Sequence, residues 1–231
     1  MRRLRHGRSL RDDAGLTLTE LLISMMIFGL LMAMVTSIMI SLTNMSKDSL
    51  ARSRAVGEAR LGLAQIDRQV RSGNVILNPA NETVATAGVP AFFSMRIYTQ
   101  EDGVPKCAQW RVIDHDEDGF GDLEFRTWDP AYPAVIKVTA WSPVAHNMVE
   151  MATPPSAQSD IKLNDPLTWP PFWVNTAASG TTKAQAVTIS LRLKDPQERA
   201  ESKATTITTT VTGRNTVYSG ASVSCSAVPT P

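Results

Sequence analysis

Residues 14–34 read AGLTLTELLISMMIFGLLMAM, and this stretch decides the fold. Glu20 is its only charged residue, and the uncharged run continues without proline over the 22 residues 21–42. An α-helix of about 20 apolar residues crosses the hydrocarbon core of a bilayer, so the run predicts a membrane-spanning helix. A carboxylate within such a helix is costly unless it is paired. Glu20 therefore raises the question of its partner.

A short basic leader precedes this stretch. Residues 1–15 contain five arginines and two aspartates, which gives the leader a net charge of +3. The positive-inside rule places these arginines in the cytoplasm and the rest of the chain outside it. The uncharged run is longer than the apolar core of about 7–15 residues in a secretory signal peptide. The sequence thus predicts a single-pass cytoplasmic membrane protein with an extracytoplasmic C-terminal domain.

The helix is predicted to continue beyond the membrane. No proline occurs between residues 16 and 78, and apolar residues recur in residues 44–72 at spacings of three and four. That spacing is typical of an amphipathic helix with one apolar stripe. We expect one nearly continuous helix over about residues 16–71, with a transmembrane half (16–43) and an amphipathic half (44–72). The expected stripe consists of Val56, Ala59, Leu63, Ile66 and Val70.

Residues 73–231 are predicted to form a β-rich domain, because short β-branched and aromatic runs alternate with turns. The fold class is therefore α+β, with the amphipathic half-helix covering one face of an antiparallel sheet. A long proline-rich loop is expected at about residues 142–182. It contains Trp169 and Trp173, which could form a binding patch or anchor the loop by packing. The expected strands are 92–99, 107–114, 123–128, 134–141, 186–194 and 204–212.

The chain has two cysteines, Cys107 and Cys225, which are far apart in the sequence. An even number of cysteines in an exported domain favours a disulfide. Two unrelated buried thiols are the alternative interpretation.

An acidic stretch separates two of the expected strands. Asp114, Asp116 and Asp118 are followed by a glycine, which is how many calcium loops begin, and Asp122 and Glu124 are possible further ligands. The stretch is not an EF-hand, because both neighbouring segments are predicted strands. Calcium is thus one hypothesis, and a solvated turn whose Asp and Gly residues suit the hairpin is the other.

The leader and the apolar run together resemble the processing site of type IV prepilins and pseudopilins. The matching residues are Gly15, Leu16 and Glu20 within GLTLTELL at 15–22. The resemblance implies cleavage by a prepilin peptidase between Gly15 and Leu16, N-methylation of Leu16 and a role for Glu20 in assembly. Leu16 departs from the phenylalanine that is usual at the first mature position, and the proline that many major pilins carry in the apolar helix is absent.

Weaker similarities lie further along the chain. They are RLGLAQIDRQVRSGNVI at 60–76, the strands CAQWRV and LEFRTW, and GRNTVY at 213–218. These resemble minor pilins of the group that includes pseudopilin J and its pilus counterpart W. The resemblance implies a pilin-like fold, and other pilin or pseudopilin subunits, the prepilin peptidase and an assembly platform as partners. It also implies incorporation into a cell-surface or envelope fibre.

Other classes of function are disfavoured. The net charge of +1 provides no general basic field for nucleic acid. The sequence contains no G-x-S-x-G, H-E-x-x-H or P-loop motif, so we do not expect an enzyme or a catalytic cofactor. The remaining alternative is an unprocessed single-pass envelope protein that acts as a binding module.

Overall fold

The computed structural model describes residues 15, 17–73, 75–174, 186–196, 198, 201–213 and 225–231. The chain divides into two compact units, Met1–Ser46 and Lys47–Pro231. Helix α1 (Leu18–Ser72) contributes to both units. The expected continuous helix is confirmed to within two residues at each end.

The first unit contains the apolar part of α1. Its large side chains face outward around the whole helix; Leu22, Phe28 and Met39, for example, are 58%, 60% and 66% exposed. Among the described residues, α1 is the one helix that is long and apolar enough to cross a membrane. An all-round apolar surface of this kind favours lipid or other helices over water.

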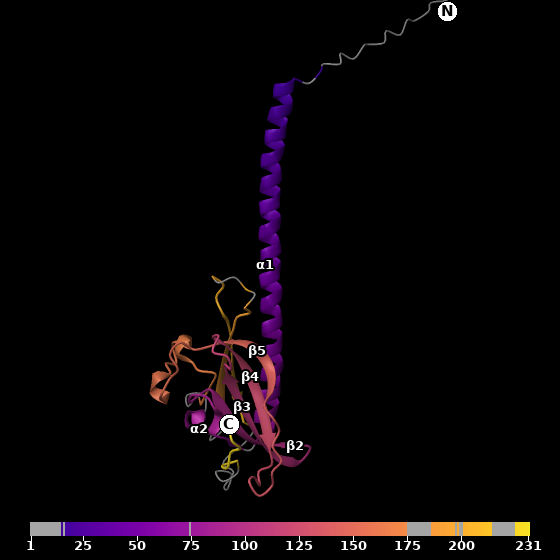
Figure 1. Cartoon of the computed structure of the whole chain (residues 1–231). Coiled ribbons are helices and arrows are strands. Elements are labelled where there is room, and N and C mark those ends of the chain that lie inside the picture. Colours follow the sequence, from indigo (N-terminus) through magenta and orange to yellow (C-terminus); the bar gives the residue numbers. More distant parts are fainter. Residues whose placement is uncertain are drawn as a thin grey trace, which may run out of the picture. The chain divides into compact units, whose positions relative to one another are not determined.

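The second unit is built around an eight-stranded antiparallel sheet among the described residues, in the order β1-β2-β3-β4-β5-β7, with β6 and β8 pairing β7 (Figure 1). Ile189 of β7 pairs with both β6 and β8, so these two strands lie on opposite edges of β7. The expected antiparallel sheet is confirmed. The strands are β1 (Val75–Ile76), β2 (Ser94–Glu101), β3 (Val104–Ile113), β4 (Phe120–Trp128), β5 (Ser142–Val149), β6 (Phe172–Val174), β7 (Ala186–Leu193) and β8 (Thr205–Thr212).

The strand expected at residues 134–141 was wrong. The chain turns after Asp129, where the N–H of Tyr132 donates to the carbonyl of Asp129 at 2.9 Å. Only Val138 then forms a β-bridge, with Trp128, and Ile136 is 81% exposed. Regular pairing of β5 with β4 begins only at Ser142. Residues 134–141 favour a strand by their local sequence, but most of them have no partner strand.

The proline-rich loop therefore starts after Val149 rather than at residue 142. Its described part contains two short 3-10 helices, η2 (Gln158–Asp160) and η3 (Pro166–Thr168), and ends in β6; residues 175–182 lie outside the described residues. Trp169 and Trp173 form a tilted ring pair, 5.5 Å between centroids, and pack against Ile161 and Phe92. Both tryptophans thus serve as packing anchors for this loop.

The C-terminal part of α1 packs on one face of the sheet, and in Figure 1 it passes behind β4 and β5. Val56 of the expected stripe is only half-buried, and Ala55 is buried in its place. Small residues let the helix approach closely: a Cβ on Gly62 would lie 2.8 Å from Leu123 Cδ2. The buried helix residues are Ala51, Ala55, Ala59, Gly62, Leu63, Ile66 and Val70.

Two short helices lie between β1 and β2. They are the 3-10 helix η1 (Pro79–Asn81), capped by the Asn78 side chain, and α2 (Val84–Ala87), which ends at Gly88 with φ 75°. Glu82 lies between them and is fully buried. A buried carboxylate requires a partner, and its partners lie on the second face of the sheet.

Candidate functional site

The predicted processing residues lie at the start of α1. Gly15 is exposed, and no atom lies within 4 Å of the position of a Cβ at this residue. Leu16 lies outside the described residues. Glu20 occupies the first turn of α1, where its N–H donates to the carbonyl of Thr17 at 3.1 Å, and its side chain is exposed. Cleavage after Gly15 and pairing of Glu20 with the new amine remain predictions.

The acidic turn between β3 and β4 folds around Asp114. Its carboxylate accepts the backbone N–H groups of Asp116 (3.3 Å), Glu117 (2.9 Å) and Gly119 (2.8 Å). Desolvation alone would raise the pKa of Asp114, but these hydrogen bonds outweigh it and hold the pKa below its ordinary value. Carboxylate oxygens of Asp114, Asp116 and Asp118 lie within 4.8 Å of one another.

Asp122 and Glu124, the other two predicted calcium ligands, are paired elsewhere. Asp122 Oδ1 lies 2.8 Å from Nδ1 of His146. Glu124 accepts from Arg111 through Oε2 and lies 2.9 Å from Nε2 of His115 through Oε1. Both residues belong to β4, whereas the three turn carboxylates lie beyond the strand end. Calcium binding by the three turn residues remains one of the two hypotheses, beside a solvated turn that needs no cation.

Cys107 of β3 and Cys225 form a disulfide with Cα atoms 5.6 Å apart, which confirms the predicted pairing. Both cysteines are buried with Trp128, and three half-buried side chains pack around them: Leu77, Tyr98 and Tyr132. The bond joins positions 118 residues apart. It fastens residues 225–231 to the face of the sheet opposite α1.

This second face carries a buried polar network that the sequence analysis missed. Alternate residues of β2, β3 and β4 form three cross-strand rows. A single charged residue in a strand normally indicates a solvent-facing position, but here three arginines are at most 7% exposed. The missed signal was one arginine in each of three consecutive strands, with Glu124 two residues before the arginine of β4. The rows are Ser94–Arg111–Glu124, Arg96–Gln109–Arg126 and Tyr98–Cys107–Trp128.

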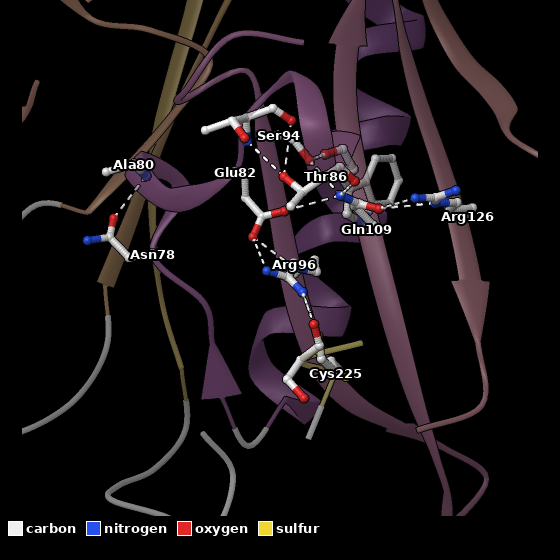
Figure 2. Close-up of polar contacts among 12 residues, drawn as sticks. Asn78, Ala80, Glu82, Thr86, Ser94, Arg96, Gln109, Arg126 and Cys225 are labelled. Atoms are coloured by element: carbon white, nitrogen blue, oxygen red, sulfur yellow. Dashed lines mark hydrogen bonds and ion pairs between the residues drawn. The ribbon is translucent and has the colours of Figure 1, made fainter. Parts of the chain in front are cut away.

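Glu82 enters the network from the segment before β2, as Figure 2 shows. Its Oε1 accepts from Arg96 Nε at 2.7 Å and lies 2.6 Å from Nη2, and its Oε2 accepts from Gln109 at 3.2 Å. Burial raises the pKa of Glu82, although the Arg96 and Gln109 contacts oppose that rise. Glu82 is thereby fixed to two strands at once.

Arg126 connects the same network to the C-terminal segment. Its Nη1 donates to the carbonyl of Thr230 at 2.6 Å, and its Nη2 donates to that of Pro229 at 3.0 Å. Arg96 donates in the same way to the carbonyl of Cys225 at 2.6 Å. These hydrogen bonds go to backbone carbonyls of residues 225–231, so they do not depend on the side chains of those residues.

The arginines outnumber the carboxylates in this network by three to two. Glu82 pairs with Arg96 and Glu124 with Arg111, but Arg126 has no carboxylate partner among the described residues. Burial, reinforced by the nearby Arg111 cation, lowers the pKa of Arg126 to about 10. The Trp141 ring partly offsets this excess of positive charge through cation–π contacts. Its centroid lies 3.9 Å and 4.3 Å from the guanidinium carbons of Arg111 and Arg126.

The geometry of the network indicates a structural role. Its charged and amide groups bond to one another or to backbone carbonyls, and they hold both the segment before β2 and the C-terminal residues on the sheet. Comparison with known proteins bears on the other end of the chain, the N-terminal residues.

Residues 10–36 match the family model of the prokaryotic N-terminal methylation motif. The match spans Gly15, Leu16 and Glu20, and it indicates pilin-type processing and methylation. Together with the long apolar helix, it supports a type IV pilin-like protein anchored in a membrane. No significant match was found among curated proteins or solved structures.

Proposed function

We propose that this protein is a minor pilin or pseudopilin, a structural subunit of a type IV pilus or of a type II secretion-like fibre. The observation that carries the proposal is the methylation motif at residues 10–36, directly joined to a helix, α1, whose C-terminal part packs on an antiparallel sheet. A basic leader, a glycine, a glutamate five residues later and an uncharged run coincide in one stretch. An ordinary membrane anchor requires only the last of these.

Cleavage after Gly15 would give Glu20 the partner that it needs. The new amine at Leu16 would lie four residues before Glu20, on the same face of the helix. A buried carboxylate is tolerated in an apolar environment when an opposite charge pairs with it. The amine of the same subunit or of a neighbour would meet this requirement and would set the register between adjacent helices.

The apolar half of α1 would provide the assembly surface. Helix association in a bilayer depends on close packing and on interhelical polar contacts, because lipid is as apolar as the side chains. The sheet domain would face outward from the fibre. Assignment to the group of pseudopilin J and its pilus counterpart W belongs to this proposal and rests on the short similarities in the sequence.

Fibre incorporation tests the proposal. The full chain is produced in a cell with a prepilin peptidase and a fibre assembly system, and sheared fibres are probed for it. We expect the wild-type chain in the fibres, and Glu20→Ala to be cleaved but strongly depleted from them; Thr19→Ala, one residue away, is the matched control. Cleaved wild-type protein that never leaves the membrane would contradict the structural role. Normal incorporation of Glu20→Ala would refute the pairing role of Glu20.

A further inference from the structure

A groove of about 700 Å³ lies on the helix-covered side of the sheet, next to the end of α1. Its walls come from residues 65–72 of α1, from the β2–β3 hairpin and from residues 139–142, and its floor comes from β3 and β4. All of these elements belong to the second unit. The volume falls within the range of about 300–1,000 Å³ that is typical of small-molecule sites.

The floor of the groove presents an aromatic ring. Phe125 lines the groove and stacks on Trp110, with centroids 5.0 Å apart and planes inclined by 24°. The indole is held in place, since its Nε1 donates to Gln69 Oε1 at 2.7 Å. The Phe125 ring is thus a fixed platform, and the negative face of such a ring attracts C–H groups.

Neutral hydrogen-bonding side chains make up most of the lining of the groove. Three glutamines, three threonines and two serines are among the fifteen lining residues. Some stiffen the groove: Ser72 and Thr99 share a hydrogen bond of 2.9 Å, and Thr139 Oγ1 accepts the N–H of Thr127 at 2.8 Å. A stiff site loses little freedom on binding. Within the described part of the chain, four lining side chains make no hydrogen bond and are available to a ligand: Gln65, Gln100, Thr127 and Ser142.

The groove carries no net charge. Its four ionisable lining residues are two cations, Arg68 and Lys106, and two anions, Glu101 and Asp102. Lys106 and Glu101 form an ion pair with each other. Neither a polyanion nor an organic cation would gain much electrostatic attraction here. Apolar side chains are few, so an aliphatic ligand is also a poor match.

We propose that this groove binds a neutral oligosaccharide. A sugar ring has an apolar C–H face that fits the Phe125 platform, and its hydroxyl groups match amide and hydroxyl side chains that lie on either side. A peptide strand is a poorer match, because β3 is already paired with β2 and β4, and β4 with β3 and β5, so the floor offers no free edge. This binding activity goes beyond the proposed role in a fibre and does not depend on N-terminal processing.

The test uses the full-length protein in a zwitterionic detergent, since detergents with sugar headgroups would compete. Neutral hexasaccharides of glucose, mannose, galactose and N-acetylglucosamine are titrated by calorimetry, with tryptophan fluorescence as a second readout because Trp110 lies under the platform. We expect at least one hexasaccharide to bind with a Kd of about 10 μM to 1 mM. A heparin hexasaccharide is expected to bind at least tenfold more weakly than that ligand.

Two conservative variants localise the site. Thr127→Val removes one hydroxyl with little change of shape, and Phe125→Leu removes the ring but keeps an apolar side chain on Trp110; each is expected to weaken binding roughly tenfold. Thr208→Val, an exposed threonine on β8, is the matched control and should bind as the wild type does. If Phe125→Leu fails to fold, Gln65→Ala replaces it. Failure of every neutral hexasaccharide to bind, equal binding by Thr127→Val, or tighter binding of heparin or of a serine- and threonine-rich decapeptide would overturn the proposal.

Discussion

Arg126 and Gln109 lie opposite each other on β4 and β3, and Nε and Nη2 of the arginine donate to the same amide oxygen, Gln109 Oε1, at 3.0 Å and 2.8 Å. This contact orients the amide, so that its nitrogen donates to Glu82 at 3.2 Å. Glu82 in turn binds Arg96. The Gln109 amide therefore links two buried arginines of like charge, one of which has no carboxylate partner within the described chain.

Glu82→Gln tests the energetic importance of this network. The substitution keeps the shape of the side chain but leaves the Arg96 cation buried beside a neutral group. Breaking one partner of a buried ion pair typically costs about 3–5 kcal/mol, and we expect a loss of stability of this size. The measurement is thermal or urea unfolding followed by tryptophan fluorescence.

Glu101→Gln is the control for that experiment. Glu101 pairs with Lys106, and their side chains are 62% and 38% exposed. An exposed pair contributes about 0.2–1 kcal/mol. Equal losses for Glu82→Gln and Glu101→Gln would show that the buried network contributes no more than a surface pair.

Two glycines of α1 should respond to alanine in opposite directions. At Gly57 no atom other than those of its chain neighbours and of the helix's own backbone lies within 4 Å of a new Cβ, so Gly57→Ala should stabilise the protein by about 0.5–1 kcal/mol through higher helix propensity. At Gly62 the new Cβ would lie 2.8 Å from Leu123 Cδ2, whose side chain is fully buried. Overpacking of this kind costs about 1–3 kcal/mol, so Gly62→Ala should destabilise. The melting temperatures of both variants test these opposite changes in stability. A higher melting temperature for Gly62→Ala would mean that α1 lies farther from Leu123 than the structure places it.

The acidic turn should be stable without a cation, because Asp114 already accepts three backbone N–H groups. We therefore expect the same melting temperature in EDTA and in millimolar calcium. A clear rise with calcium that disappears in Asp116→Asn would assign a cation to Asp114, Asp116 and Asp118. Asp160→Asn, which alters another exposed carboxylate that accepts N–H groups, is the control.

The helix and the disulfide could be predicted because each depends on residue types that can be read directly from the sequence. A long segment without proline and an apolar stripe defined α1, and the two cysteines of an exported domain defined the bond. The position of β5 could not be predicted, since residues 134–141 have strand propensity, but after the turn at Asp129 only Val138 among them forms a β-bridge to β4. Strand status depends on a partner, which the local sequence does not contain.

The partners of the candidate site residues could not be predicted either, because they too lie far away in the sequence. Asp122 and Glu124 follow the acidic turn closely in sequence, but the alternation of β4 directs them to His146 and to Arg111. The buried arginine network was missed because charge normally indicates exposure. Two of its arginines, Arg96 and Arg126, bond to carbonyls of residues 225–231 at sequence separations of 103 to 129, which no local pattern indicates.

Mass spectrometry of the N-terminal peptide shows whether the chain is cut between Gly15 and Leu16. The protein is isolated from cells with an active prepilin peptidase, and Gly15→Val, which should remain uncut, is analysed beside it. We expect a mature chain that begins with N-methylated Leu16. A wild-type protein that retains Met1 and its leader in those cells would rule out pilin-type processing of this chain.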